Sequence, residues 1–444
     1  MNAHVRAPVA ARASSRTQNR APSHVHVVGA GLAGLSAAME LAASGIPVTV
    51  HESGPAAGGR CRSYFDKELG CRLDNGNHLL LSGNRAAYAF LDRVGARATM
   101  GGPGAPVFPF MDTSTGERWT VRPNRGRIPW WLFSPRRRVP GAGLREFLPV
   151  LALSRAGPDA TVAGTLRPGE LYRRLLEPLA IAALNTPPAT ASAALLGAVV
   201  AESLALGGAA CIPAFPKEGL SESFIDPAVA WLRARGAEVR LGSRVTRLDR
   251  DGTRATALDG RSLGNDEAVV LAVPAPVAAG LLPGLQAPTG FESILNVHYR
   301  CDADPGEAGF TGVIGGTAEW VFVKPGVVSV TISAGNRCAD AAPVDLATQV
   351  WADVRAVLGG SAAHPQPMPQ WRVIKEKRAT FAATPAQDRL RPPARTCLSN
   401  LVLAGDWTRT GLPATIEGAI RSGCTAASLL TQIGAQDPTC RARS

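Results

Sequence analysis

Paired cysteines, aromatic side chains and long apolar runs are all scarce in this sequence. Its eight cysteines are scattered, and no two of them form a C-x-x-C pair. This argues against a zinc site, a dithiol redox motif and a disulfide scaffold. We therefore expect reduced cysteines, no bound metal and a cytoplasmic enzyme.

No segment is long and apolar enough to predict a transmembrane helix. A span needs roughly 20 nearly uninterrupted apolar residues, and the best candidate, residues 191–212, is interrupted by Glu202. We expect this segment to form one or two buried helices. Any contact with a membrane, which we place at the inner membrane, is then peripheral.

Acidic residues are outnumbered by basic ones. The chain has 47 Lys and Arg against 35 Asp and Glu, a formal net charge of +12, which favours anionic partners such as nucleic acid or phospholipid headgroups. No zinc-finger spacing, RNP-like aromatic cluster or basic heptad region accompanies the charge, so we expect no nucleic-acid partner and favour an anionic membrane surface. A charge that serves only solubility is an equally open interpretation.

Residues 1–23 contain four arginines, no acidic residue and no apolar signal-peptide core. This composition predicts a disordered basic tail rather than a secretory signal. The full length of 444 residues corresponds to two or three domains at roughly 150 residues each.

The first motif follows this tail. A β-branched run leads into Gly29, Gly31 and Gly34 in the pattern G-x-G-x-x-G, then an apolar periodic stretch, then a second β run that ends at Glu52. The order predicts a strand, a tight turn, a helix and a strand that bind a dinucleotide. The glycines let the backbone approach the pyrophosphate, the helix N-terminus attracts it, and Glu52 accepts the ribose hydroxyls.

Two further stretches distinguish flavin from nicotinamide. The pattern Glu52-Ser53-x-x-x-x-Gly58-Gly59-Arg60 resembles the second signature of the FAD-dependent amine oxidase and phytoene desaturase superfamily. The segment 74–78, D-N-G-x-H, resembles that of squalene-associated FAD-dependent desaturases, the hydroxysqualene dehydroxylases of hopanoid synthesis. The resemblance extends over most of residues 24–432.

This resemblance implies an α/β fold: a Rossmann-like FAD-binding domain of the GR2 type with an inserted mixed-sheet substrate domain and a helical cap. We expect the FAD-binding domain to comprise 24–84, 215–290 and 395–432. Segments 85–214 and 291–394 then form the substrate-binding, membrane-facing domain. The helical spacing of 85–210 predicts the cap, and the alternating runs of 291–378 predict a mostly antiparallel sheet.

One segment of the cap combines aromatic and basic residues. Trp130, Trp131, Leu132 and Phe133 lie between Arg125, Arg127 and the arginines of 136–138. Such a block suits a segment that enters the lipid interface while its charges bind anionic headgroups. An internally packed aromatic cluster is the alternative.

A second cofactor element lies near the C-terminus, where a buried strand leads into Gly405-Asp406 and a helix that starts near Pro413. The resemblance implies that Asp406 binds a ribityl hydroxyl or a phosphate-linked water, that the helix start faces the flavin pyrimidine ring, and that the backbone of Val245 meets the adenine. The predicted FAD-binding residues are Gly29, Ala30, Gly31, Leu32, Ala33, Gly34, Glu52, Ser53, Gly59, Arg60, Asn75, Gly76, Asn77, Val245, Gly405, Asp406, Thr415 and Ile416.

The family reaction implied by the resemblance is reductive. The allylic hydroxyl of hydroxysqualene leaves as water with acid assistance, and reduced FAD delivers hydride from N5 to give squalene. The candidate catalytic residues are His78, Asp74 and Glu417, although His78 has an equally favoured structural role and Glu417 suits the start of a helix on electrostatic grounds alone. His298, Glu319, Glu376 and Arg378 lie on alternating strands and are interpreted as ordinary outward-facing residues.

Three other functions remain open. A carotenoid or phytoene-type desaturase would run the same scaffold oxidatively. A flavin amine oxidase is disfavoured because only 5% of the residues are aromatic, and a non-catalytic GDI-like prenyl carrier is disfavoured by the intact G-x-G-x-x-G and Glu52. The single dinucleotide fingerprint gives no separate NADPH site, which leaves the external electron donor unassigned.

Overall fold

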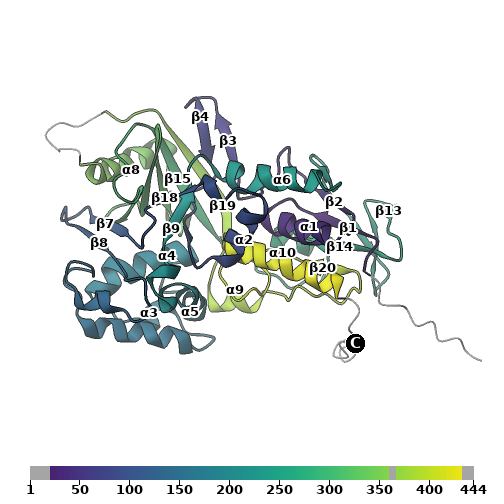
Figure 1. Cartoon of the computed structure of the whole chain (residues 1–444), viewed down its shortest axis with the longest axis horizontal. Helices are drawn as coiled ribbons and strands as arrows, with labels where there is room; N and C mark the ends of the chain where they lie inside the picture. The colour runs from purple at the N-terminus through teal and green to yellow at the C-terminus, as the bar shows by residue number, and fades with distance from the viewer. Residues whose placement is uncertain (1–20, 360–366, 433–444) are drawn as a thin grey trace, which may run out of the picture.

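Two β-sheets organise the molecule, and a helical region lies beside the larger one (Figure 1). The computed structural model describes residues 21–359 and 367–432. Most of the predicted basic tail, residues 1–20, lies outside the described residues. Each sheet is assembled from segments far apart in the sequence.

The smaller sheet has five parallel strands in the order β10-β2-β1-β14-β20. Its central strand is buried along nearly its whole length, as expected of a parallel strand that is covered on both faces. All five strands fall within the three segments predicted for the FAD-binding domain. They are β1 His24–Val28, β2 Val48–His51, β10 Glu238–Arg240, β14 Glu267–Leu271 and β20 Leu401–Leu403.

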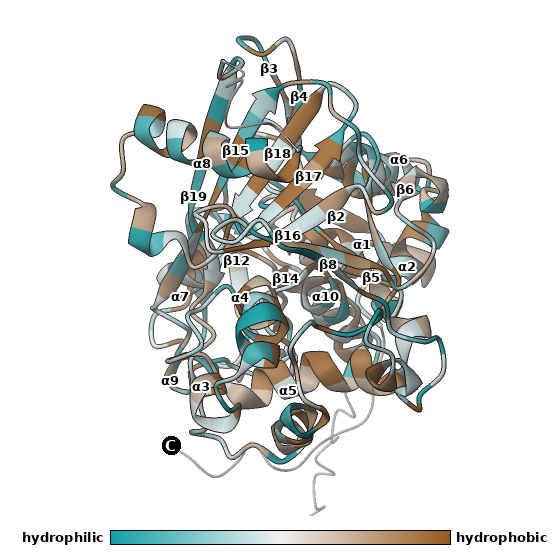
Figure 2. Cartoon of the chain, turned by 90° about the vertical axis from the view of Figure 1, so that its left-hand side faces the viewer, coloured by the Kyte–Doolittle hydropathy of each residue, from teal (hydrophilic) through white to brown (hydrophobic). Residues whose placement is uncertain are grey.

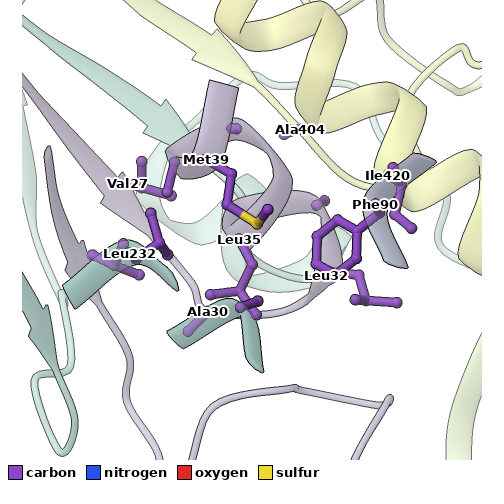
Figure 3. Packing of buried hydrophobic residues seen from close by; sticks show 14 of the residues in the cluster. Val27, Ala30, Leu32, Leu35, Met39, Phe90, Leu232, Ala404 and Ile420 are labelled. Atoms are coloured by element: carbon purple, nitrogen blue, oxygen red, sulfur yellow. The ribbon is translucent and has the colours of Figure 1, made fainter. Parts of the chain in front are cut away.

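Helices from both ends of the chain cover this sheet. Helix α1 (Leu32–Ala43) packs directly on α10 (Ile416–Thr431), so closely that a Cβ on Gly423 would lie 2.2 Å from the carbonyl oxygen of Ala33. Figure 3 shows the shared core, in which side chains of α1 and α10 meet those of α2 (Arg85–Arg93) and α6 (Asp226–Arg233). Each large apolar side chain buried here contributes about 1.5–3 kcal/mol.

The larger sheet has seven strands in the order β19-β15-β18-β17-β16-β7-β8. It is mostly antiparallel, as the sequence predicts, with β16 and β7 as a parallel pair. Helix α8 (Pro343–Val357) packs Leu346, Val350 and Val354 against it. The strands are β7 Phe108–Asp112, β8 Arg118–Val121, β15 Phe291–Arg300, β16 Phe310–Ile314, β17 Trp320–Lys324, β18 Val327–Ile332 and β19 Trp371–Phe381.

The region predicted as a helical cap is only partly helical. Strands β7 and β8 extend the larger sheet because their aromatic side chains pack together, with the rings of Phe110 and Trp119 stacked at 5.7 Å. The helical remainder lies below this sheet in Figure 1. It contains α3 Val162–Thr165, α4 Glu177–Leu184, α5 Ala193–Glu202, the 3₁₀ helices η2 Trp130–Phe133 and η3 Leu144–Arg155, and the π-helical turn η4 Tyr172–Leu176.

The remaining elements are short. They are β3 Ser63–Asp66, β4 Cys71–Asp74, β5 Leu80–Leu81, β6 Met100–Gly101, β9 Pro213–Pro216, β11 Leu248–Arg250, β12 Ala255–Leu258, β13 Arg261–Ser262, α7 Ala275–Leu281, α9 Pro385–Arg389, η1 Arg97–Thr99, η5 Leu204–Leu206, η6 Gly208–Ala210, η7 Ser221–Ile225 and η8 Gly335–Cys338. Within residues 21–359 and 367–432, every helix is too short or too polar to cross a membrane.

Candidate functional site

A single large cavity of about 2180 Å³ runs between the two sheets and the helical region. Typical small-molecule pockets measure roughly 300–1,000 Å³, so this one has room for a dinucleotide together with a second large ligand. Its walls include the glycine turn after β1, the Gly405-Asp406 turn after β20, and apolar residues of the helical region.

The glycine turn is tightly packed on its inner side and open toward the cavity. A Cβ on Gly34 would lie 1.9 Å from the carbonyl oxygen of Gly29, and Gly29 itself has a φ of +104°, which favours glycine. A Cβ on Gly31 would meet nothing within 4 Å. The turn therefore presents bare backbone and the N-terminus of α1 to the cavity, which is the arrangement that a pyrophosphate requires.

Glu52 braces this turn at the end of β2. One carboxylate oxygen accepts a hydrogen bond from the backbone N–H of Ala30 at 2.9 Å, and the other accepts one from Gly54 at 2.8 Å. Glu52 also lines the cavity, as do Ser53 and Val245. These three residues thus lie together around the end of the cavity predicted to hold the adenosine.

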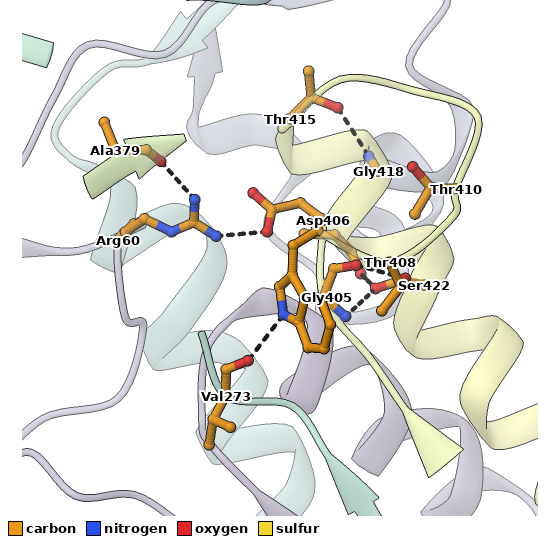
Figure 4. Close-up of polar contacts among 12 residues, drawn as sticks. Arg60, Val273, Ala379, Gly405, Asp406, Thr408, Thr410, Thr415, Gly418 and Ser422 are labelled. Carbon is orange, nitrogen blue, oxygen red and sulfur yellow. Dashed lines mark hydrogen bonds and ion pairs between the residues drawn. The ribbon is translucent and has the colours of Figure 1, made fainter. Parts of the chain in front are cut away.

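The second turn brings together residues from opposite ends of the chain (Figure 4). Arg60 donates to Asp406 Oδ1 at 2.7 Å and to the carbonyl oxygen of Ala379 at 2.5 Å. Burial lowers the pKa of Arg60, but the ion pair with Asp406 outweighs this and raises it overall. Ser422 of α10 receives the backbone N–H of Gly405 at 2.8 Å, which fixes the turn against the helix start.

Sequence analysis missed the residue that supports this turn from behind. Arg391 is 1% exposed and donates to the carbonyl oxygens of Thr408 and Asp406 and to the hydroxyl of Thr410. Arg391 also forms an ion pair with Asp388, with 2.8 Å between Nη1 and Oδ1. No motif surrounds Arg391, so the sequence carries no signal for this role.

Most predicted cofactor residues line the cavity. Ala30 and Gly34 are the exceptions: Ala30 contributes its N–H to Glu52, and Gly34 provides the close approach behind the turn. The residues present fit FAD, because a gap without side chains at Gly31, a helix N-terminus and polar groups at both turns face one cavity. The predicted members of its lining are Gly29, Gly31, Leu32, Ala33, Glu52, Ser53, Gly59, Arg60, Asn75, Gly76, Asn77, His78, Val245, Gly405, Asp406, Thr415 and Ile416.

The geometry weighs against two of the three predicted catalytic residues. Asp74 is buried behind the cavity, where it accepts hydrogen bonds from Ser63 and Leu220 and pairs with Lys324 at 2.7 Å. Glu417 borders the cavity, but its two oxygens accept the backbone N–H groups of Ala86 and Ala87 at the start of α2. The contacts of both carboxylates are therefore with other parts of the protein, which indicates structural roles.

His78 does line the cavity. Burial lowers the pKa of its imidazole to about 4, and the nearby charge of Asp74 opposes this shift only in part. The ring is thus neutral at neutral pH, where it can orient a hydroxyl group through a hydrogen bond. A neutral imidazole is a poor proton donor, which favours the structural or orienting role of His78 over that of a catalytic acid.

Beside His78 lies a patch of polar side chains in an otherwise apolar wall. Asn77 donates to Thr331 Oγ1 at 3.0 Å, Thr331 donates to Asn296, and Asn296 donates to the carbonyl oxygen of Asn75. Asn75 in turn donates to Glu376 Oε2 at 3.1 Å. The prediction that Glu376 faces outward is wrong, because this side chain lines the cavity.

The far end of the cavity is apolar and reaches the molecular surface. Phe133, Leu148 and Leu151 line it, yet they are 65%, 63% and 70% exposed. Together with Ile128 and Trp130, which are 60% and 64% exposed, they form a surface that we call the apolar rim. Figure 2 shows apolar segments in this lower region, around α5.

The aromatic block predicted for the membrane interface is divided between surface and interior. Trp130 and Phe133 are exposed, with their rings 6.2 Å apart. Trp131 is buried and packs edge-on against Phe147 at 5.7 Å. The sequence prediction is therefore too broad for Trp131, and it missed the exposed leucines of η3.

Comparisons with known proteins show the family of the chain. The model of the family described as "Flavin containing amine oxidoreductase" matches residues 32–431. The hydroxysqualene dehydroxylase of Rhodopseudomonas palustris is 47% identical, with 92% of this chain and 99% of that protein covered. Those of Sinorhizobium fredii and Zymomonas mobilis are 46% and 43% identical, again over 92% of this chain and 98% and 99% of theirs.

Solved structures show the same fold at low identity. An oxidoreductase from Methanosarcina mazei has a TM-score of 0.67 at 15% identity, with 91% of this chain and all of that chain covered. Cyclohexylamine oxidase from Brevibacterium oxydans has a TM-score of 0.65 at 19% identity, with coverages of 93% and 99%. These likenesses establish the architecture on which the cavity is built.

Proposed function

The chain belongs to the family of flavin-containing amine oxidoreductases, and from this membership and its dehydroxylase relatives we propose that it acts as a hydroxysqualene dehydroxylase. It is an FAD-dependent oxidoreductase that removes the hydroxyl group of hydroxysqualene and yields squalene. The observation that carries the proposal is the single cavity, whose polar end fits FAD and whose other end is apolar and long.

FAD supplies the reducing equivalents of this reaction when it is bound. The chain itself positions the cofactor: the turn at Gly31 and the N-terminus of α1 would hold the pyrophosphate, and Glu52 the ribose. Arg60 and Asp406 would hold the ribityl and phosphate region at the second turn. We propose that a separate molecule reduces the cofactor, because the sequence contains a single G-x-G-x-x-G fingerprint.

The apolar end of the cavity would bind the isoprenoid chain and exclude water. Burial gives about 0.8 kcal/mol per carbon, so a chain of about thirty carbons gains roughly 20 kcal/mol on leaving water. Leu175, Leu179, Trp320 and Phe322 are among the apolar residues that line the wall. The polar patch around Asn77 and Thr331 would then meet the hydroxyl group at one point along the chain.

We further propose that the apolar rim docks on an anionic membrane surface and that the protein is cytoplasmic and peripherally bound to the inner membrane. Exposed arginines surround the rim, namely Arg125, Arg127, Arg136, Arg137, Arg145 and Arg155. Apolar side chains flanked by cations suit the headgroup region of an anionic leaflet. Because rim residues also line the cavity, docking would let the substrate enter from the lipid.

Anaerobic turnover tests the proposed reaction. Enzyme reconstituted with FAD and then reduced should convert hydroxysqualene to squalene, with one squalene formed per flavin reoxidised. Phytoene supplied to the oxidised enzyme serves as the competing substrate. Desaturation of phytoene without any squalene from hydroxysqualene would contradict the proposal, and so would a purified protein that does not bind flavin.

A further inference from the structure

We infer that Glu376 is the acid that protonates the leaving hydroxyl group, an inference that rests on the proposed dehydroxylase function. Glu376 lies on β19, opposite Ile294 of β15, and both side chains line the cavity. Its hydrogen bond with Asn75 and its proximity to Arg60 place a carboxyl group beside the second cofactor turn. This side chain is absent from the residues that the sequence motifs nominate.

The other carboxyl groups that line the cavity already have hydrogen-bond or ion-pair partners. Glu52 accepts two backbone N–H groups at the first turn, and Asp406 is paired with Arg60. Glu202 receives two hydrogen bonds from Arg421, at 2.8 and 2.7 Å. Glu417 caps α2 and also pairs with Arg421. Each of these four carboxyl groups thus already has a cation or two backbone N–H groups as partners.

Glu376 differs from them in its surroundings. Among the described residues its hydrogen-bond partner is the amide of Asn75, at 3.1 Å, and it forms no ion pair within 4.0 Å. The nearby cation is Arg60, whose two donor groups are directed to Asp406 and to the carbonyl oxygen of Ala379. One guanidinium thus neighbours two carboxyl groups and forms an ion pair with one of them, Asp406.

Apart from Arg60, the groups described here around Glu376 are neutral or directed elsewhere. Asn75, from the loop after β4, and Ile294, from β15, are neutral. On its own strand, Lys375 turns to the opposite face and donates to the carbonyl oxygens of Ala339 and Ala341, and Lys377 is exposed. His78 is neutral as described above. Glu376 is therefore the cavity acid that is free to exchange a proton with a ligand.

The proposed step balances without any further reactant. The carbon–oxygen bond of the allylic alcohol breaks, and the oxygen leaves as water with the proton of Glu376. Reduced FAD, when bound, would supply the hydrogen and electron pair that the carbon gains and would be oxidised in the same turnover. Glu376 would regain its proton from the one that the reduced cofactor releases.

Three variants of the full-length, FAD-loaded enzyme test this assignment. Glu376→Gln removes the acid, Glu376→Asp keeps an acid on a shorter side chain, and Glu292→Gln makes the same change on β15 outside the cavity. Each is assayed for bound FAD, for hydroxysqualene binding to the oxidised enzyme by flavin fluorescence, and for single turnover of the reduced enzyme across pH. Infrared difference spectra record whether a protonated carboxyl band shifts when hydroxysqualene binds to the oxidised enzyme.

We expect E376Q to bind FAD and substrate within about threefold of the wild type and to turn over about 100- to 10,000-fold more slowly. Its rate should lose the decline with rising pH that an acid imposes. E376D should regain part of the rate, E292Q should match the wild type, and the shifted carboxyl band should be missing from E376Q alone.

Two results would overturn the inference. One is E376Q turnover within tenfold of the wild type with an unchanged pH profile. The other is a wild-type infrared spectrum without a substrate-sensitive carboxyl band, which decides the matter even where E376Q does not retain FAD. A wild-type enzyme that forms no squalene contradicts the proposed function instead, so the two failures are distinguishable.

Discussion

At the scale of single residues, the site depends on charges whose partners are remote in the sequence. Asp406 is 5% exposed, and its carboxylate is held by Arg60, which comes from the other end of the chain. Removing one partner of a buried ion pair is costly because the remaining charge is left uncompensated, and exposure of Arg60 reduces that cost through solvent screening. Arg60 also lines the cavity, so loss of the ion pair should weaken ligand binding as well as reduce the stability of the fold.

We predict that Asp406→Asn weakens FAD binding by at least about tenfold, because the released Arg60 no longer holds the turn at the second cofactor element. The ratio of flavin absorbance to protein absorbance after dialysis measures this loss. Asp266→Asn, an exposed carboxylate outside the cavity, should retain flavin like the wild type. Full flavin retention by D406N would exclude a ligand role for Asp406.

His298 is a second residue whose behaviour follows from its place in the tertiary structure. It is 2% exposed and forms a hydrogen bond with Ser329 at 2.8 Å. Burial lowers the pKa of its imidazole to about 4 from the ordinary value of 6.5. The unfolded chain therefore binds a proton between these values that the folded protein does not, so stability falls as the pH drops from 6.5 to 4.

We predict that His298→Gln removes part of this acid sensitivity. A shift of about 2.5 pH units corresponds to about 3 kcal/mol, so the wild type should lose up to that much more unfolding free energy than H298Q between pH 7 and pH 4. Denaturant unfolding at the two pH values measures the difference. Equal losses in the two proteins would show that His298 does not titrate in this way.

At the scale of elements, the glycine turn contains one glycine that the fold requires and one that the ligand requires, and the sequence motif does not distinguish them. Gly34 is needed because the backbone of Gly29 lies where its Cβ would be, and this is a requirement of the fold. Gly31 has free space around the position of a Cβ and a φ of −72°, which alanine adopts readily. We therefore expect that glycine is needed at this position because the bound ligand occupies the space of a Cβ.

We predict that Gly31→Ala folds normally but binds FAD at least about tenfold more weakly, because its methyl group occupies cofactor space. Gly34→Ala should also unfold more easily, since its Cβ would collide with backbone. Thermal unfolding of the flavin-free proteins and titration with FAD separate the two effects. Wild-type FAD affinity in G31A would contradict the assignment of this turn to the pyrophosphate.

At the scale of the whole molecule, one cavity joins a buried polar end to an exposed apolar end. Strands β1, β2, β10, β14 and β20 supply the polar end, and the helical region supplies the apolar end. Five large apolar side chains of the rim, namely Ile128, Trp130, Phe133, Leu148 and Leu151, are each at least 60% exposed. Contiguous exposed apolar patches of this kind mark interaction surfaces.

We predict that replacing Leu148 and Leu151 by serine lowers binding to vesicles of phosphatidylglycerol and phosphatidylcholine by at least about tenfold, since each buried leucine contributes about 1.5–3 kcal/mol. Co-sedimentation measures the bound fraction. Val344→Ser, which changes a residue 52% exposed on α8 away from the rim, is the matched control. Equal binding of the double variant and the wild type would contradict docking through the rim.

Local sequence motifs were sufficient to identify the cofactor class and to predict residues that line the cavity. The glycine pattern, the acid at the end of the second strand, and the Gly-Gly-Arg and Gly-Asp elements are short motifs that the sequence displays, although their contacts join distant parts of the chain. The alternation of residues 291–378 likewise determined a mostly antiparallel sheet. These features can be recognised in the sequence because strand periodicity and turn geometry produce short, local residue patterns.

Only the tertiary structure decided which polar groups are free to do chemistry. Glu417 caps α2, Asp74 is paired with Lys324, and Glu376, opposite Ile294 of β15, lines the cavity. Strand alternation alone does not say which face of a sheet borders a cavity. The availability of a carboxyl group depends on partners brought together by folding, and those partners lie up to hundreds of residues away.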